Sequence, residues 1–192
     1  MLVGLLSLCI EIFRGEDKPF LNIATVNFGM VWLGLLLGSL ISVRLIPEHG
    51  FIITMAMFVS VWICDTAAFW FGMKFGKRKI LPKVSPNKTW EGLLGAVITI
   101  MLISGFLAPF LTPLDFKTSL IAGLLISLAG FIGDIVISSV KRDLEIKDTG
   151  NLIPGHGGLL DRLDSLTYTA PLFFHFIYFT CKMIILTGMV VS

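Results

Sequence analysis

The apolar run from Ser119 to Val140 reads SLIAGLLISLAGFIGDIVISSV and holds one ionisable residue, Asp134. A helix needs about 20 predominantly apolar residues to cross the hydrocarbon core of a bilayer, so this run predicts a transmembrane helix. The basic pair Lys141 and Arg142 follows at once. The helix is therefore expected to end at a charged membrane surface.

The composition of the whole 192-residue chain agrees with this interpretation, since 55% of its residues are hydrophobic and 15% are charged. A soluble domain is about a quarter charged, so the excess of apolar residues predicts an all-α, polytopic integral membrane helix bundle. We expect a single membrane-embedded domain over residues 1–192 and no soluble domain. About six transmembrane segments are predicted, at Met1–Phe13, Leu21–Val43, Phe51–Phe71, Leu93–Leu111, Ser119–Val140 and Leu166–Leu186.

The distribution of Lys and Arg predicts the orientation of the bundle. Twelve of the 15 basic residues lie in alternate loops, after the first, third and fifth segments, and three lie on the other side. Loops rich in Lys and Arg stay in the cytoplasm, which predicts a multi-pass protein of the inner (plasma) membrane with these loops inside the cell. Because the first segment is short and begins abruptly, we also expect helices upstream of Met1 to be missing from this sequence.

Asp134 lies inside an apolar run, where an ionisable group is costly and indicates a functional site by default. Asp134, Ser138, Lys141 and Arg142 fall at i, i+4, i+7 and i+8. This spacing places them on one face of a helix. The structural alternative for Asp134 is an ion pair, either with Lys141 or with a base on another helix, and both interpretations are kept.

Two further carboxylates, Asp161 and Asp164, open the last apolar segment at a spacing that puts them on one helix face. Capping is the structural alternative, because carboxylates are stabilised at a helix N-terminus. With Asp134 available from the preceding helix, the three carboxylates instead indicate a hard-cation site, and Mg²⁺ prefers a few carboxylates together with phosphate oxygens and water. Gly130 and Gly133 would permit close packing of the neighbouring helix.

The loop between these helices, Glu145–Leu160, is rich in glycine and holds one histidine, His156. Glycine lets backbone N–H groups approach an anion closely. Arg binds phosphate through two parallel donors, and Lys binds it as a point charge. Next to Lys141, Arg142 and the acidic residues, the loop therefore predicts a phosphate site, although His156 could instead only fix the loop.

A second basic loop connects the third and fourth segments. Positive-inside charge and attraction to anionic lipid account for its Lys77–Lys79 run. They do not account for Ser85–Gly92, which reads SPNKTWEG. In this stretch a Pro-bearing turn is expected to end with Thr89 as a helix N-cap, followed by Glu91 in the first turn.

Two residues just before that cap, Asn87 and Lys88, are expected at the mouth of the helix, where a phosphate or a nucleotide binds readily. The preceding segment carries Asp65, a second carboxylate within an apolar run. Asp65 is predicted to be either a structural partner for a base or a polar wall of the site.

The run from Ser138 to Asp164 resembles the signature of the phosphatidate cytidylyltransferase family, also called CDP-diacylglycerol synthases. The pattern is Ser, Lys-Arg, Lys-Asp, Gly, Pro-x-His-Gly-Gly and Asp-Arg-x-Asp, and each element is present here at the family spacing. Asp65-Thr66 with the later FGMKFGK, and SPNKTWEG, resemble other motifs of that family. The resemblance covers roughly residues 61–166, with a signature region at 134–165, and implies an N-terminally truncated bacterial member.

The resemblance implies a reaction in phospholipid biosynthesis, in which CTP and phosphatidic acid give CDP-diacylglycerol and pyrophosphate. It implies Mg²⁺ held by Asp134 and Asp161 with Asp164 close by, and it leaves open a second, monovalent cation such as K⁺. The expected partners are CTP, phosphatidic acid and the lipid bilayer, with no nucleic acid, and a homodimer is also compatible with it. The active site is then expected at the cytoplasmic face.

Carried over position by position, the resemblance gives two sets of candidate residues. The candidate catalytic residues are Asp134, Lys141, Arg142, Asp161 and Asp164. The candidate substrate-binding residues are Asn87, Lys88, Ser138, Lys147, Asp148, His156, Gly157, Gly158 and Arg162.

Two other functions fit the same residues. In a cation transporter or channel, the intramembrane Asp65 and Asp134 would line an ion path, but such a path does not need the long glycine- and lysine-bearing loop. A CTP-dependent kinase or cytidylyltransferase acting on an isoprenoid lipid would share the phosphate chemistry. A purely structural membrane subunit leaves the charge cluster unexplained.

Overall fold

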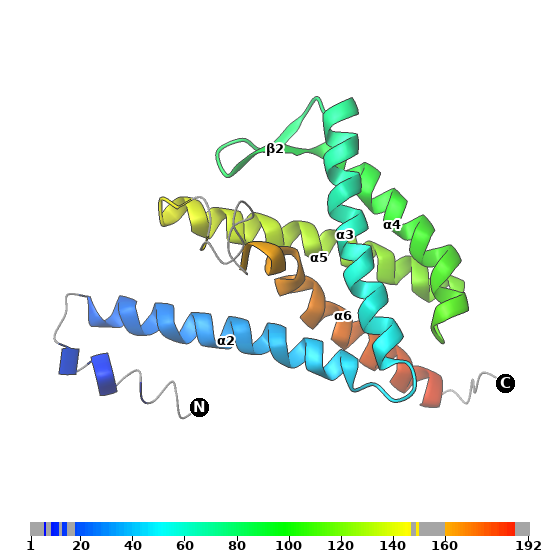
Figure 1. The fold of residues 1–192 in the computed structure, drawn as a ribbon, viewed down its shortest axis with the longest axis horizontal. Helices are drawn as coiled ribbons and strands as arrows, with labels where there is room; N and C mark the ends of the chain where they lie inside the picture. Colours follow the sequence, from blue (N-terminus) through cyan, green and yellow to red (C-terminus); the bar gives the residue numbers. More distant parts are fainter. Residues whose placement is uncertain are drawn as a thin grey trace.

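The computed structural model describes residues 18–146, residue 149 and the backbone of residues 160–186, together with residues 6, 9–11, 13 and 14 near the start of the chain. Within the last helix, side chains are described for residues 163–180. In chain order the elements are α2 (Pro19–Arg44), α3 (Gly50–Phe75), β1 (Lys79–Leu81), β2 (Ser85–Thr89), α4 (Trp90–Leu111), α5 (Phe116–Asp143) and α6 (Leu160–Leu186) (Figure 1).

The fold is mostly helical, and within the described residues four helices, α2 to α5, are long and apolar enough to cross a membrane. They contain the second to fifth predicted segments and extend each by a few residues. Many of their apolar side chains face outward, such as Phe110, which is 87% exposed. Lipid is the natural neighbour of such a surface, so these helices support a multi-pass membrane protein. The sixth predicted segment lies within α6, and the first falls largely outside the described residues.

Several hydroxyl groups on the helices are satisfied within their own helix. Thr66 donates to the Trp62 carbonyl oxygen at 2.8 Å, and Thr99 donates to the Gly95 carbonyl oxygen at 2.7 Å. Donation to the carbonyl of residue i−4 hides the hydroxyl hydrogen without a partner on another helix. Such local bonds let a polar residue remain in a segment surrounded by hydrocarbon.

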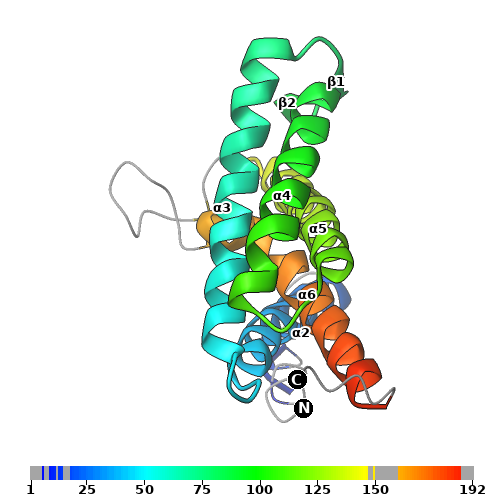
Figure 2. The same cartoon turned by 90° about the vertical axis from the view of Figure 1, so that its right-hand side faces the viewer.

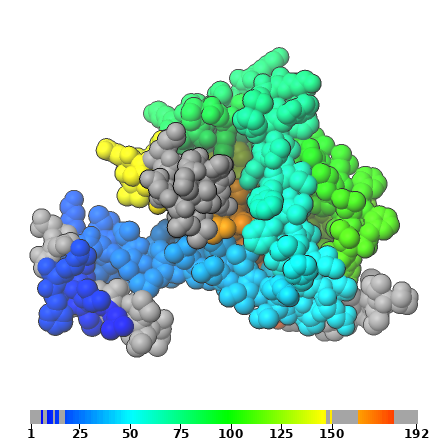
Figure 3. All heavy atoms as spheres, viewed as in Figure 1, coloured from blue at the N-terminus to red at the C-terminus, as the bar shows by residue number. Residues whose placement is uncertain are grey.

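The helices pack mostly against their neighbours in sequence. α3 and α4 lie side by side, α5 packs on α4, and α6 packs on α5 (Figures 1 and 2). α2 returns to pack on α6 and lies at the end of the molecule away from the strands (Figures 1 and 3). The core between α2, α3, α5 and α6 is formed by buried side chains such as Leu36, Met57, Ile126 and Ile177.

A short β ribbon joins α3 to α4, where only a Pro-bearing turn was predicted. Strands β1 and β2 are antiparallel, with Lys79 opposite Thr89 and Leu81 opposite Ser85. The pairing is extended at its base by the Trp90 N–H, which donates to the Arg78 carbonyl oxygen at 3.0 Å. The sequence of these strands is lysine-rich, contains Pro86 and lacks apolar alternation, so the usual strand signal is absent. The all-α prediction therefore holds for the helices but omits this ribbon.

Candidate functional site

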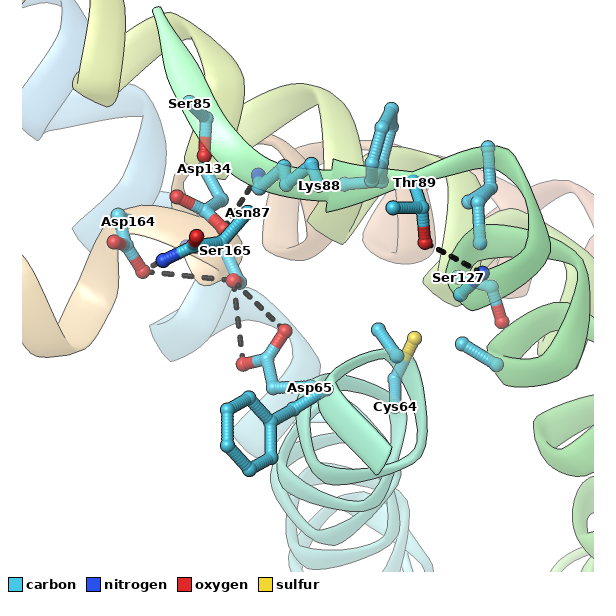
Figure 4. A pocket seen from close by; sticks show the side chains of 16 residues that line it. Cys64, Asp65, Ser85, Asn87, Lys88, Thr89, Ser127, Asp134, Asp164 and Ser165 are labelled. Carbon is cyan, nitrogen blue, oxygen red and sulfur yellow. Dashed lines mark hydrogen bonds and ion pairs between the residues drawn. The ribbon is translucent and has the colours of Figure 1, made fainter. Parts of the chain in front are cut away.

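A cavity of about 390 Å³ opens where the β ribbon meets the helices. α3, β2, α4, α5 and α6 all contribute to its wall, and the charged side chains of Lys88, Asp134 and Asp164 lie toward the same side of it (Figure 4). The polar or ionisable lining residues are Cys64, Asp65, Ser85, Asn87, Lys88, Thr89, Ser127, Asp134, Asp164 and Ser165.

The Lys88 ammonium lies beside Asp134 in this cavity. Its Nζ is 2.5 Å from Asp134 Oδ2 and 4.8 Å from the centre of the Phe131 ring. The Ser138 hydroxyl donates to the other Asp134 oxygen at 3.1 Å. The ion-pair alternative predicted for Asp134 is therefore present, but its base comes from strand β2 and not from a helix.

The Lys88 ammonium retains unused donor capacity. An ammonium has three N–H donors, and within the described part of the chain its Nζ makes no hydrogen bond of ordinary geometry in addition to the electrostatic contact with Asp134. A buried cation on a cavity wall with free donors can bind an anionic group of a ligand. Among the described residues, Lys88 thus pairs with Asp134 and keeps donors that no described group uses.

A second polar group links α3 to α6. The Ser165 hydroxyl lies 3.4 Å from both carboxylate oxygens of Asp65 and 3.5 Å from Asp164 Oδ1. The Ser165 backbone N–H donates to the same Asp164 oxygen at 2.7 Å. Asp65 is therefore part of the polar wall, as one of its two predicted alternatives stated. Its presence within an apolar run was the signal, although neither Asp65 nor Ser165 was among the candidate site residues.

Two glycines bring the helices of the site close together. A Cβ on Gly133 of α5 would lie 2.5 Å from the Asp164 carbonyl oxygen of α6. A Cβ on Gly92 of α4 would lie 2.6 Å from the Ala68 carbonyl oxygen of α3. Only a residue without a Cβ fits at such an approach. The predicted close packing at Gly133 is confirmed, whereas Gly130 makes ordinary contact, with Thr169 Oγ1 at 3.5 Å from its added Cβ.

The N-cap prediction at the mouth of α4 is also confirmed. The Thr89 hydroxyl accepts a hydrogen bond from the Gly92 N–H at 3.2 Å, and Glu91 lies in the first turn. Asn87 and Lys88 precede this cap on β2 and line the cavity. The expected position of these two residues at the start of α4 is therefore correct.

Acidic groups outnumber bases in the cavity wall, with Asp65, Asp134 and Asp164 facing Lys88. Lys88 and Lys141 both interact electrostatically with the Asp164 carboxylate. Carboxylate oxygens are the donors that Mg²⁺ prefers. Among the side chains that the structure describes, no three His, Cys, Asp or Glu residues lie close enough to hold a metal ion. The predicted ligand Asp161 has its side chain outside this described set, so the Mg²⁺ site stays a prediction.

The remaining predicted residues fall into two groups. The first is the basic pair Lys141 and Arg142, neither of which lines the cavity. Arg142 reaches the ribbon, where its Nε donates to the Val84 carbonyl oxygen at 3.4 Å. The second group lies outside the described residues or, for its last two members, outside the described side chains: Lys147, Asp148, His156, Gly157, Gly158, Asp161 and Arg162.

Comparison with known proteins shows which family the chain resembles. The sequence profile of the "Cytidylyltransferase family" matches residues 1–180. The chain is 42% identical over 176 residues to "Uncharacterized protein YnbB" of Escherichia coli (strain K12), an alignment that covers 89% of this chain and 59% of the relative.

Two further relatives carry the name "Phosphatidate cytidylyltransferase". The protein of Haemophilus influenzae is 41% identical over 138 residues, which cover 69% of this chain and 48% of the relative. The protein of Bacillus subtilis (strain 168) is 35% identical over 176 residues, which cover 91% of this chain and 64% of the relative. The chain thus spans about half to two thirds of the length of the curated relatives it matches.

Proposed function

This chain belongs to the cytidylyltransferase family, and from that premise we propose that it transfers a cytidylyl group from CTP to phosphatidic acid, giving CDP-diacylglycerol and pyrophosphate. The observation that carries the proposal is the Lys88 ammonium on the cavity wall, 2.5 Å from Asp134 and with donors to spare. The cavity wall thus combines an anion-binding group with acidic groups suited to a hard cation. Both are needed where two polyanionic substrates meet.

The proposed reaction is a displacement at the α-phosphorus of CTP. A phosphate oxygen of phosphatidic acid forms the new P–O bond, and the bond to the β-phosphate bridging oxygen breaks as pyrophosphate leaves. The nucleophile is already an anion, so the chain needs no strong general base. The main task of the site is to bring two anions together and to hold them in line.

The chain's own residues are proposed to divide that task. Lys88 would contact a substrate phosphate and offset its charge, which is worth most in a cavity that excludes water. Asn87 adjoins it on β2 and would offer amide donors to CTP. Lys141 and Arg142 would orient the pyrophosphate. The predicted loop residues Lys147 and His156 would complete the phosphate contacts.

Mg²⁺ is the proposed cofactor, and Asp134 and Asp161 would hold it with Asp164 close by. The donor set fits, since Asp134 and Asp164 present hard oxygen atoms to one cavity. When bound, the ion supplies charge neutralisation on phosphate oxygens. A monovalent cation such as K⁺ remains a further proposal.

The position of the cavity suits substrates that arrive from two phases. It lies next to the ribbon and the C-terminal end of α5, on the side of the basic loops that is predicted to be cytoplasmic. CTP would enter from the cytoplasm, and phosphatidic acid would reach the site laterally from the bilayer.

The acceptor lipid is the finer part of the proposal. YnbB, which aligns with 89% of this chain, is named as uncharacterized and so identifies no acceptor lipid. An isoprenoid phosphate would present the same kind of nucleophile as phosphatidic acid. Membranes that contain the chain should therefore be supplied with CTP labelled at the α-phosphorus and, in parallel, with phosphatidic acid or an isoprenyl monophosphate.

The proposal expects label in a chloroform-soluble product with phosphatidic acid, together with one pyrophosphate per lipid formed. If label appears only with the isoprenyl acceptor, the lipid substrate is an isoprenoid phosphate and not phosphatidic acid. Cation flux into liposomes without any CTP turnover would instead support the transporter alternative.

A further inference from the structure

One side chain outside the cavity connects the end of α3 to the start of α4. The Glu91 carboxylate accepts hydrogen bonds from the backbone N–H groups of Lys77, at 3.1 Å, and Arg78, at 3.2 and 3.3 Å. These amides follow the end of α3 at Phe75, whereas Glu91 lies in the first turn of α4. A single carboxylate therefore bridges the two elements that flank the β ribbon.

The backbone at this junction is closely packed. A Cβ on Gly76 would lie 2.8 Å from Thr89 Cγ2, and one on Gly92 would lie 3.1 Å from Thr89 Oγ1. The Trp90 N–H also donates to the Arg78 carbonyl oxygen at 3.0 Å. The base of the ribbon is thus held by the Glu91 carboxylate and by the packing of the Thr89 side chain against Gly76 and Gly92.

The ribbon has little stability of its own. Its strands span three and five residues, and the pairing shifts register between Lys79 and Leu81. An isolated two-stranded hairpin is at best marginally stable in water. Lys88 lies on this ribbon immediately before Thr89, so the position of its ammonium depends on how firmly the base is held.

We propose that Glu91 is a positioning residue for the candidate site. It fixes the base of the ribbon and thereby holds the Lys88 ammonium against Asp134 at the cavity wall. Glu91 itself lies outside the cavity lining. Because the hydrogen-bond partners of its carboxylate are backbone amides, these bonds do not depend on the side chain of Lys77.

The first test reads the position of Lys88 without requiring activity. Membranes with the wild-type chain or Glu91→Ala are treated with an amine-acylating ester, and the rate of Lys88 modification is measured by mass spectrometry. We expect severalfold faster modification in Glu91→Ala, because a loosened ribbon releases Lys88 from Asp134. The matched control is Lys77→Ala, which keeps the backbone N–H and should retain the wild-type rate at Lys88.

An unchanged rate at Lys88 in Glu91→Ala contradicts the proposal, and so does an equal increase in Lys77→Ala. Should Glu91→Ala fail to accumulate in membranes, Glu91→Gln is measured instead. The amide keeps an acceptor oxygen but lacks the charge, so a smaller increase is expected. A wild-type rate in that variant would then count against the proposal.

The second test rests on the proposed function and uses CTP incorporation. A misplaced phosphate-binding group can cost one to two orders of magnitude in rate, so Glu91→Ala should lower kcat/KM about tenfold. If Glu91 acts through Lys88, the double variant Glu91→Ala/Lys88→Ala should lose no more than Lys88→Ala alone. Multiplying losses would show a general structural effect and overturn the proposal. Absence of incorporation by the wild-type chain would refute the proposed function, while the labelling result would still decide the role of Glu91.

Discussion

Gly133 of α5 packs against the backbone carbonyl of Asp164 at the start of α6, so closely that a Cβ at position 133 would lie 2.5 Å from that oxygen. The next residue along α5 is Asp134, which pairs with Lys88. The absence of one side chain thus lets two acidic residues from different helices face one cavity. The geometry of the site depends on this helix contact as much as on its charged groups.

Gly133→Ala is expected to destabilise the protein and to lower activity. The added methyl must displace backbone, and overpacking of this kind costs about 1–3 kcal/mol. Thermal unfolding in detergent measures the effect. Gly130→Ala is the matched control three residues earlier on α5, because its Cβ would meet its nearest atom at an ordinary 3.5 Å. Equal unfolding temperatures for the two variants would contradict the described contact.

Thr89→Val tests the cap at the mouth of α4. Valine keeps the shape of threonine but loses the hydroxyl that accepts from the Gly92 N–H, and a lost N-cap costs about 1 kcal/mol. The control is Thr66→Val, where the hydroxyl only returns to its own helix at the Trp62 carbonyl oxygen. Its stability should change by less than about 0.5 kcal/mol. Unfolding curves for both variants decide the point, and a larger loss at position 66 would count against the assigned cap.

Asp115, the N-cap residue of α5, makes the stability of the folded protein depend on pH. Interaction with the Thr118 hydroxyl, and more weakly with nearby backbone amides, holds the pKa of Asp115 below its ordinary value. A lowered folded pKa stabilises the protein above the unfolded pKa, and this contribution disappears as pH falls through the folded pKa. Wild type should therefore be slightly more stable than Asp115→Asn at pH 6, and the difference should shrink towards pH 3. A difference that grows on acidification would refute the assignment.

Asp134→Asn is expected to reduce CTP incorporation by roughly two orders of magnitude, the usual loss when one preorganised charged or polar group is removed from such a site. The variant should also require more Mg²⁺ for half-maximal activity, since a proposed ligand loses its charge. Asp143→Asn on the same helix is the control and should behave as wild type. Near-wild-type incorporation and Mg²⁺ dependence in Asp134→Asn would remove Asp134 from the proposed metal site.

Much of this arrangement was predictable because the membrane imposes simple rules. The predicted segment Ser119–Val140 lies within α5 at Phe116–Asp143, and Leu21–Val43 lies within α2 at Pro19–Arg44. Apolar length alone predicts such helices. The cap at Thr89 was equally predictable, since N-capping depends on residues a few positions apart.

The contacts across the site could not be predicted in the same way. Lys88 and Asp134 are distant in sequence, and which base meets Asp134 depends on how β2 crosses α5. The ribbon lacked a strand signal, because its pairing is fixed by Glu91 and Trp90 at its base and not by its own alternation. Asp65 was recognised as an intramembrane carboxylate, but only the approach of α6 brings Ser165 to it.

The central claim is that the cavity between β2, α5 and α6 is where CTP and the lipid phosphate react. The most direct test measures incorporation of α-labelled CTP into lipid by Lys88→Ala and by Lys83→Ala, an exposed lysine on the same ribbon. We predict that Lys88→Ala loses about 100-fold or more in kcat/KM, whereas Lys83→Ala stays within about twofold of wild type. Equal activities of the two variants would contradict the claim.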